Sequence, residues 1–517
     1  MSQNSLRRRL SAMDAFFLHI ETEEQPMNVG CVDIFEGKIS YTKFVRNIES
    51  RLHLIPRYRQ VVTPAPFNVG LPTWEFDPNF NIRNHIKRVK IDSPGSEEQF
   101  YDIAGQLFSG PLDRSKPLWE IHLVEGLAQK RTGMLAKVHH CMIDGIAGVG
   151  LMHAVFDAWP NPEKTRKQPY RPDPIPSPTQ LLYDALWDGL SETLEHWSKF
   201  QKNLAEYGDG KDIKEVLTDV KEFGLTMKDF LSPIKRFPFN KPFSGKRTII
   251  GRSFSFAEAR DIRTACGGTV NDVALTVVSG AIQRYLEMHG ESLRKQTVRI
   301  LVPVNIRQED ERGEMGNRIS FLPVDIPLDI LDPVERLRII AETTQHLKET
   351  KVIEAISLMF NVLQGAPTLL QSIALSNAAS SSGQFLLGLL AQVPPSHLIC
   401  TNVPGPQIPL YTVGHQLLTH YVLLPVALEM GISCGVTSYD QRLYISIIGD
   451  AQAAPDSDKI VDFLADSFHE LRVAAEVKER LYVEIPRAFR PAARVVTRTA
   501  AQAQAPSAAP PGRQAVM

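Results

Sequence analysis

Residues that could carry chemistry gather in one short stretch, HHCMIDGIAG, which runs from His139 to Gly148. Two adjacent histidines, an aspartate and a glycine come directly after an apolar run from Met134 to Val138. In a chain of this composition and length, the pattern HHxxxDG has a chance occurrence on the order of one in a thousand. The stretch has three interpretations: a metal site, a catalytic base, or two buried structural histidines.

A metal site is the weakest of the three. Adjacent side chains on a strand point to opposite faces, so His139 and His140 would not both ligate one ion. No cluster of cysteine, histidine and glutamate stands beside them to complete a ligand set. We therefore predict no metal.

A catalytic base explains more of the motif. A strand that ends at His140 would present an imidazole, whose pKa lies near neutrality and suits removal of a proton from a hydroxyl. Asp144 is placed to cap the helix that follows, and Gly145 allows a sharp turn or the close approach of a substrate. No serine or cysteine partner stands at a suitable spacing, and Cys141 should point away from His140. Direct attack by an activated alcohol is therefore expected rather than a covalent enzyme intermediate, with buried structural histidines as the alternative.

Strands and helices in alternation must position this stretch. MNVGCVDIF, IHLVEG and GMLAKVHH are typical of strands, and YTKFVRNIESRLHLI is typical of an amphipathic helix that Pro56 ends. Further on, RSFSF and TVRILVPVNI predict strands, and VNDVALTVVSGAIQRYLEMHG predicts a helix ending at Gly290. The chain is therefore expected to have an α/β fold with its site in a cleft between two blocks.

A proline-rich polar stretch, Pro160 to Pro178, predicts a linker between the blocks, followed by helical segments. The tail after Pro486 has no periodicity and is expected to be disordered. The predicted parts are an N-terminal domain with the histidine motif, a linker with a helical segment, a C-terminal domain and a tail: residues 1–159, 160–247, 248–485 and 486–517.

Composition narrows the class of protein. The chain has 517 residues, 43% of them hydrophobic and 22% charged, with a formal net charge of -1. That charge balance predicts no nucleic-acid partner, because nucleic acid is bound by a basic face. The five cysteines form no CxxC pair, and no secretory signal or membrane-spanning stretch is evident, so a cytoplasmic protein is expected.

One long span, Ala355 to Leu428, contains no charged residue. Pro, Gly, Ser and Asn interrupt it too often for a membrane span. It is interpreted first as a buried core segment. The alternative is the wall of a site for an apolar ligand, or a lipid-facing surface, in particular at Phe385–Leu390.

Two other motifs are set aside. Gly431–Gly435 matches the G-x-S-x-G pattern, but a strand rather than a helix is expected after Ser433, which excludes a nucleophile elbow. The glycines of GIAGVG stand in the wrong order for a dinucleotide-binding loop.

The histidine motif and several other segments resemble a known family. HHCMIDG looks like the HHxxxDG signature of CoA-dependent acyltransferases. Seven further segments are similar to bacterial wax ester synthase/acyl-CoA:diacylglycerol acyltransferases: SAMDAFFL, PLWEIHLVEGL, VNDVALTVVSGAIQRYL, LVPVNIR, GNRIS, TNVPGP and YISIIGDAQAAPD. TNVPGP has Thr where Ser is expected, a conservative difference. The resemblance implies two similar chloramphenicol-acetyltransferase-like α/β domains with mixed sheets and a tunnel at their interface.

The resemblance also implies roles for single residues. His140 would be the general base and His139 its support. Asp144 would be structural, held by an arginine for which Arg307 is the candidate, and Gly145 would lie beside the thioester. In the second block, Asn271 would contribute to activity, and three residues would bind substrate: Asp272, Asn402 and Gly405.

The expected function is transfer of a long acyl chain from acyl-CoA to diacylglycerol or a long-chain fatty alcohol, with no cofactor. Such a protein would associate peripherally with the inner membrane face or with lipid droplets. Two alternatives are a condensation-type or carrier-protein-dependent acyltransferase, and a lipid-surface binding protein without catalysis. The intact His140, Asp144 and Gly145 argue against the second.

Overall fold

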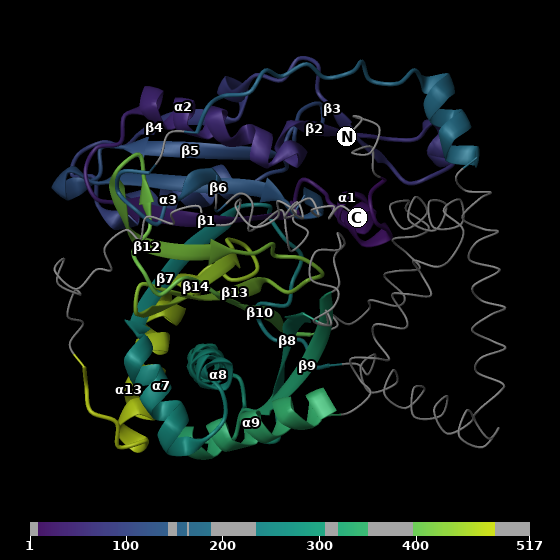
Figure 1. Ribbon diagram of the computed structural model, residues 1–517. Helices are drawn as coiled ribbons and strands as arrows, with labels where there is room; N and C mark the ends of the chain where they lie inside the picture. Colours follow the sequence, from purple (N-terminus) through teal and green to yellow (C-terminus); the bar gives the residue numbers. More distant parts are fainter. Residues whose placement is uncertain are drawn as a thin grey trace, which may run out of the picture. The chain divides into compact units, whose positions relative to one another are not determined.

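A computed structural model describes residues 9–142, 152, 154–162, 165–187, 234–305, 319–349 and 396–480. The chain divides into two units, Met1–Arg480 and Leu481–Met517. All described residues belong to the first unit (Figure 1).

The first sheet carries the histidine motif. Within the described residues it has six strands in the order β11-β12-β1-β6-β5-β4. Only β4 and β5 run parallel; the other neighbours are antiparallel, so the sheet is mixed, as predicted. Its central strands are buried on both faces, which fits their long apolar runs. The strands are β1 Asn28–Phe35, β4 Ile86–Lys90, β5 Trp119–Glu125, β6 Thr132–His139, β11 Tyr411–Thr412 and β12 His415–Leu423.

The second sheet is also mixed. Its described strands follow the order β7-β14-β13-β10-β8-β9, with parallel pairs at β13/β10 and β10/β8. Ser433 is the second residue of β13, inside a strand, so the structure agrees that it is no nucleophile elbow. The strands are β7 Arg247–Ser255, β8 Thr297–Asn305, β9 Ile319–Pro327, β10 Leu398–Pro404, β13 Ile432–Tyr439 and β14 Arg442–Asp450.

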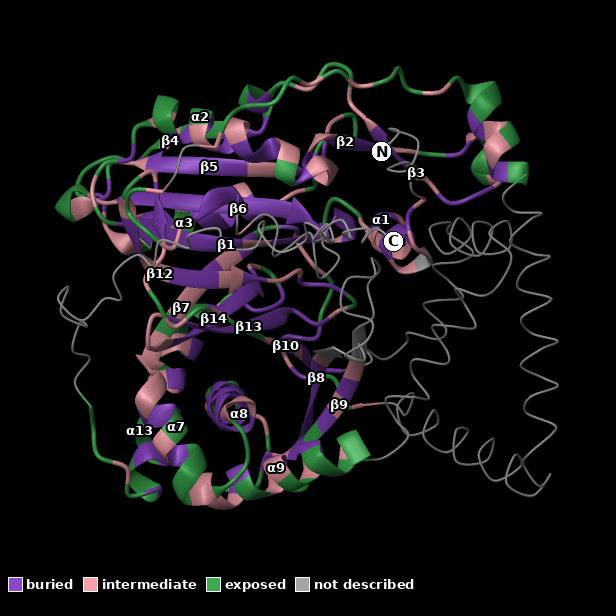
Figure 2. Ribbon diagram, viewed as in Figure 1, coloured by how far each residue is buried: buried purple, intermediate pink, exposed green. Residues whose placement is uncertain are grey.

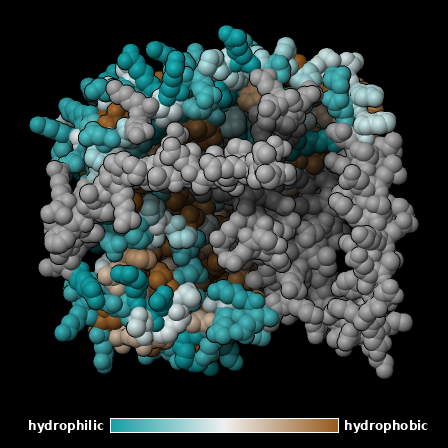
Figure 3. Space-filling view, viewed as in Figure 1, coloured by the Kyte–Doolittle hydropathy of each residue, from teal (hydrophilic) through white to brown (hydrophobic). Residues whose placement is uncertain are grey.

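Helix α8 is the core helix of the second half, and Figure 2 shows it buried almost throughout. It spans Val270–Met288, and Gly290 follows with a φ of 73°, as the predicted helix end requires. Helix α9 lies outside it and presents a hydrophilic surface (Figure 3). The remaining named elements are α1 Ala12–Ile20, α2 Tyr41–Arg51, α3 Glu97–Phe108, α7 Phe256–Cys266, α9 Pro333–Glu349, α13 Ile460–Ala474, β2 Gln60–Thr63 and β3 Thr73–Phe76.

The helix predicted over YTKFVRNIESRLHLI is α2, but its last turn is a 3₁₀ turn, Leu52–Leu54, that leads to Pro56. Half of the helix predicted after the histidine motif lies outside the described residues, and residues 152, 154 and 155 are helical. In the predicted linker, the hydroxyl of Tyr170 donates to the carbonyl of Asp77 at 2.8 Å, so this stretch is attached to the residue that follows β3.

Strand β12 joins the two halves. It lies far along the chain, yet it pairs with β1 in the first sheet, with His420 opposite Asp33. It also contacts the second sheet, where the hydroxyl of Tyr439 donates to the carbonyl of Leu417 at 3.0 Å. The sheets therefore do not follow a boundary at residue 248, because a segment from the second half completes the first sheet.

No single helix in the described ranges is long and apolar enough to cross a membrane. The bent pair α7–α8 reaches the required length and composition only as two helices joined at 99°.

A fully buried ion pair organises the end of β14. Asp450 pairs with Arg247 of β7, and both side chains are almost completely buried. The Asp450 carboxylate also accepts hydrogen bonds from four backbone N–H groups, those of Ser244, Gly245, Gln452 and Ala453. Asp450 lies in the segment YISIIGDAQAAPD, and these contacts show that the aspartate of this segment has a structural role.

Asp450→Ala should lower the free energy of unfolding by about 3–5 kcal/mol, because it leaves the buried Arg247 unpaired. Glu342→Ala, which removes an exposed ion pair with Arg338 on α9, is the matched control and should cost about 0–1 kcal/mol. Urea unfolding of both variants measures the difference, and equal small losses would show that the buried pair does not hold this region.

Candidate active site

Strand β6 delivers the histidine pair to its carboxyl end. His139 is the last residue of β6 and is fully buried, whereas His140 begins a 3₁₀ turn, His140–Met142, and is partly exposed. The backbone N–H of His140 donates to the carbonyl of Met27 at 2.8 Å. The N–H of His139 donates to the carbonyl of Leu118, in the PLWE segment, at 2.9 Å. The turn is thus fixed by main-chain contacts on both sides.

His140 lies against helix α1. Its ring stacks on Phe17, with centroids 3.9 Å apart and planes at 29°. Phe17 belongs to SAMDAFFL, so this segment helps to orient the imidazole. Burial, with the neighbouring His139, lowers the pKa of His140 to about 4, although its own main chain acts in the opposite direction. The imidazole is therefore neutral at pH 7, the form that accepts a proton.

His139 faces the other way and is held in one tautomer. Its Nδ1 accepts a hydrogen bond from the N–H of Cys141 at 3.1 Å. A neutral ring whose Nδ1 is an acceptor carries its proton on Nε2, and Nε2 lies 3.4 Å from Oε1 of Glu21. His139 thus contacts the turn through Cys141 and lies beside Glu21; its predicted supporting role stays a prediction.

Glu21 is a site residue that the sequence did not indicate. Its side chain is only 2% exposed, and Oε1 accepts from the N–H of Met27 at 3.0 Å. Oε2 accepts from Arg114 at 3.0 Å. Burial raises the pKa of Glu21, but the neighbouring His139 and the hydrogen bonds from Met27 and Arg114 outweigh it and lower the pKa overall. In sequence, ETEEQ is typical of a solvated acidic loop, so no local signal marks the first glutamate as buried.

The residues from Glu21 to Met27, which we call the acidic segment, also reach the second half of the chain. The guanidinium of Arg247 donates to the carbonyl of Glu24 at 2.7 Å. The N–H of Leu428 donates to the side chain of Gln25 at 2.8 Å. One short segment therefore contacts the histidine turn and the elements around β7 and β12.

Several predicted residues cannot be placed. Asp144, Gly145, the candidate partner Arg307 and the segment 385–390 lie outside the described residues. Their roles stay predictions.

Asp272 and Asn271 lie at the start of α8. The carboxylate of Asp272 accepts from the N–H and the hydroxyl of Thr269 at 2.8 and 2.7 Å, and from the hydroxyl of Thr344 at 2.8 Å. These are the contacts of a helix capping box, and they support a structural position for Asp272; its predicted part in substrate binding stays untested. Asn271 is partly exposed beside it.

Asn402 and Gly405 lie at the end of β10. Asn402 is opposite Val436 of β13, and a Cβ atom at position 405 would lie 2.3 Å from the carbonyl oxygen of Ser438, so only glycine fits there. No hydrogen bond or ion pair of the described residues joins His140 to Asn271, Asn402 or Gly405. The predicted parts of Asn271, Asn402 and Gly405 in activity and substrate binding stay predictions.

Cys141 is no candidate nucleophile. It is buried, and burial together with Asp14 and Glu21 raises the pKa of its thiol well above the ordinary value. A thiol in this environment stays protonated and unreactive.

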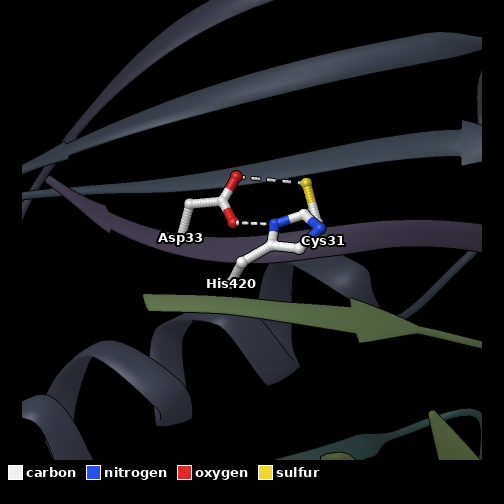
Figure 4. Close-up of side chains that lie close together, drawn as sticks. All are labelled: Cys31, Asp33 and His420. Carbon is white, nitrogen blue, oxygen red and sulfur yellow. Dashed lines mark hydrogen bonds and ion pairs between the residues drawn. The ribbon is translucent and has the colours of Figure 1, made fainter. Parts of the chain in front are cut away.

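One group of described side chains has donors suited to a metal ion: Cys31, Asp33 and His420 (Figure 4). Asp33 lies between the other two, accepting from the thiol at 3.2 Å and from Nδ1 of His420 at 2.7 Å. Cys31 is opposite Ala136, three residues before His139, which is roughly 10 Å along the strand. This group joins β1 to β12 and is separate from the histidine turn.

Comparison with known proteins shows the family of the chain. Residues 10–274 match the wax ester synthase/diacylglycerol acyltransferase catalytic domain, and residues 315–472 match the C-terminal domain of the same family. A putative diacylglycerol O-acyltransferase of Mycobacterium tuberculosis is 28% identical over 471 residues, covering 90% of each chain.

Two solved structures share the fold. The wax ester synthase/diacylglycerol acyltransferase of Marinobacter aquaeolei covers 91% of this chain and all of its own, at 21% identity and a TM-score of 0.62. A starter condensation domain of rhizomide synthetase, solved with C8-CoA, covers 92% of this chain and 96% of its own, at 15% identity and a TM-score of 0.52. This likeness confirms the predicted fold class. The chain belongs to the wax ester synthase/diacylglycerol acyltransferase family and is an acyltransferase.

Proposed function

We propose that the protein moves a long acyl chain from acyl-CoA to the hydroxyl of diacylglycerol or of a long-chain alcohol, with His140 as general base. The observation that carries this proposal is the neutral, partly exposed imidazole of His140, fixed at the end of β6 by Phe17 and Met27. The names of the family and of its mycobacterial relative support the acceptor class. The C8-CoA bound by the rhizomide condensation domain supports acyl-CoA as donor.

The acyl transfer needs one group that takes a proton from the acceptor hydroxyl and returns it to the leaving sulfur. The unprotonated nitrogen of His140 takes the proton from the acceptor hydroxyl as its oxygen attacks the thioester carbonyl. The C–S bond then breaks, the CoA sulfur leaves with the electron pair, and the imidazolium returns the proton to it. The products are an ester and CoA, and the base is regenerated.

No covalent enzyme intermediate is required. Cys141 is buried and protonated, and Ser433 lies inside a strand. Nδ1 of His140 is buried and has no partner in another described residue, so Nε2 is the nitrogen that would meet the acceptor.

Diacylglycerol and long-chain alcohols partition into lipid. We propose that the protein meets them as a peripheral protein at the inner membrane face or at a lipid droplet.

Purified protein given labelled palmitoyl-CoA, with hexadecanol and dioleoylglycerol offered side by side, should release CoA and form labelled ester. His140→Ala should lose about 100- to 10,000-fold in rate, the usual contribution of a general base, while its melting temperature stays near that of the wild type. A variant that keeps more than about a tenth of the rate would remove His140 from the proposed role.

The pH dependence follows from the lowered pKa of His140. The base works in its neutral form, so activity is lost as pH falls through that pKa. With a pKa of about 4, kcat/KM should be level between about pH 6 and pH 8 and should fall only toward about pH 4–5. An acid limb centred near the ordinary histidine value of 6.5 would contradict the lowered pKa of His140. Recovery of activity on return to pH 7.5 controls for unfolding.

Glu21 should affect kcat because it helps to position the histidine turn. Glu21→Ala leaves the N–H of Met27 without its acceptor and removes the carboxylate beside Nε2 of His139, which should cost about 1–3 kcal/mol of stability. Misplacement of the turn should lower kcat by about 10- to 100-fold with little change in KM. Glu21→Gln keeps the size and one acceptor oxygen, so it should recover most of the loss. An effect confined to KM would point to substrate contact instead.

A further inference from the structure

Three buried side chains with metal-binding atoms meet where β1 pairs with β12. Cys31 and Asp33 are two residues apart on β1, so their side chains leave the same face of the first sheet. His420 of β12 is directly opposite Asp33 and shares that face. The thiol sulfur, a carboxylate oxygen and an imidazole nitrogen all lie within 4.8 Å of one another (Figure 4). Residues far apart in the chain thus place three donor atoms around one point.

The carboxylate of Asp33 has no lysine or arginine to balance its charge. Asp33 is fully buried, and in the described part of the chain its only ion pair is with His420. The Cys31 thiol donates to Oδ2 at 3.2 Å, and Nδ1 of His420 lies 2.7 Å from Oδ1. A carboxylate removed from water is costly unless positive charge or strong hydrogen bonds compensate it. A thiol is a weak donor, so the positive charge must come from a protonated His420 or from a bound cation.

The rings that pack around His420 do not supply that charge. The His420 ring lies 6.3 Å from Phe156 and 6.2 Å from Tyr439, centroid to centroid. The Tyr439 hydroxyl donates to the carbonyl of Leu417 and accepts from the N–H of Leu410. Neither ring is cationic, so the charge of Asp33 is balanced within the group of three.

We propose that Cys31, Asp33 and His420 bind a Zn²⁺ ion. Thiolate, imidazole and carboxylate are donors that zinc prefers, whereas magnesium and calcium take oxygen ligands. Zinc binds these atoms at about 2.0–2.3 Å, so tetrahedral ligand atoms lie about 3.2–3.6 Å apart. The separations of 3.2 and 2.7 Å therefore need to change by less than about 1 Å.

Zinc binding changes the protons of the site in a defined way. The Cys31 thiol loses its proton to solvent, and the imidazole of His420 keeps a proton on Nε2 alone. Three protein ligands leave the fourth position of a tetrahedral zinc to water. The ion joins β1 to the strand that also contacts the second sheet, so it stabilises the connection between the two halves.

Cobalt(II), which replaces zinc and absorbs visible light, tests the site without any measurement of turnover. Metal-free full-length protein should bind a single Co²⁺ with d–d bands and a thiolate-to-cobalt charge-transfer band, and added Zn²⁺ should displace it. Cys31→Ser removes the sulfur and should abolish the charge-transfer band. Cys266→Ser changes a cysteine of α7 outside the group; it is the matched control and should keep the band.

Thermal unfolding gives a second readout that does not depend on cobalt. Saturating Zn²⁺ should raise the melting temperature of the wild type by about 2–4 °C, because the ion binds the folded chain. It should not raise that of Cys31→Ser. If Cys31→Ser fails to fold, His420→Gln takes its place and should weaken Co²⁺ binding by about tenfold or more.

Three results would each overturn the proposal. The first is a wild type without the charge-transfer band, which would leave Asp33 and His420 as an ion pair without a metal. The second is an equal band in Cys31→Ser, which would place the cobalt elsewhere. The third is a melting temperature of the wild type that Zn²⁺ does not change.

Discussion

The buried contact between Glu21 and His139 is the constraint on which the site depends. A carboxylate that is 2% exposed is costly to bury unless hydrogen bonds satisfy it. Its partners, His139, Met27 and Arg114, come from three separate segments. Because Met27 in turn accepts from the N–H of His140, satisfying one buried charge also fixes the turn that presents the base.

The same segment makes the site sensitive to the second half of the chain. Arg247 holds the carbonyl of Glu24 while it pairs with Asp450, so the acidic segment is tied to the ends of β7 and β14. Strand β12 adds a second connection, since it completes the first sheet and contacts β13 and β14. Loss of order in the second sheet would therefore displace the histidine turn, although the second sheet need not contact His140 directly.

Local patterns predicted β1, β6, β8 and α8 because each is a long apolar or periodic run with clear end signals. They could not predict that β12 pairs with β1, since partners such as Asp33 and His420 are separated by most of the chain and pairing leaves no local signal. The type and spacing of HHxxxDG pointed to His140 as the base. The sequence did not indicate Glu21, because its burial depends on tertiary contacts that leave no local signal in an acidic loop.

A double-mutant cycle tests whether the contact between Glu21 and His139 positions the base. If Glu21 and His139 act on the base through one shared contact, then Glu21→Ala, His139→Gln and the double variant share one pathway. The double variant should lose no more kcat than the more severe single variant, because the shared contact is already broken. Losses that multiply, within about a factor of two, would mean that the two residues act on the base independently, which would contradict a shared contact.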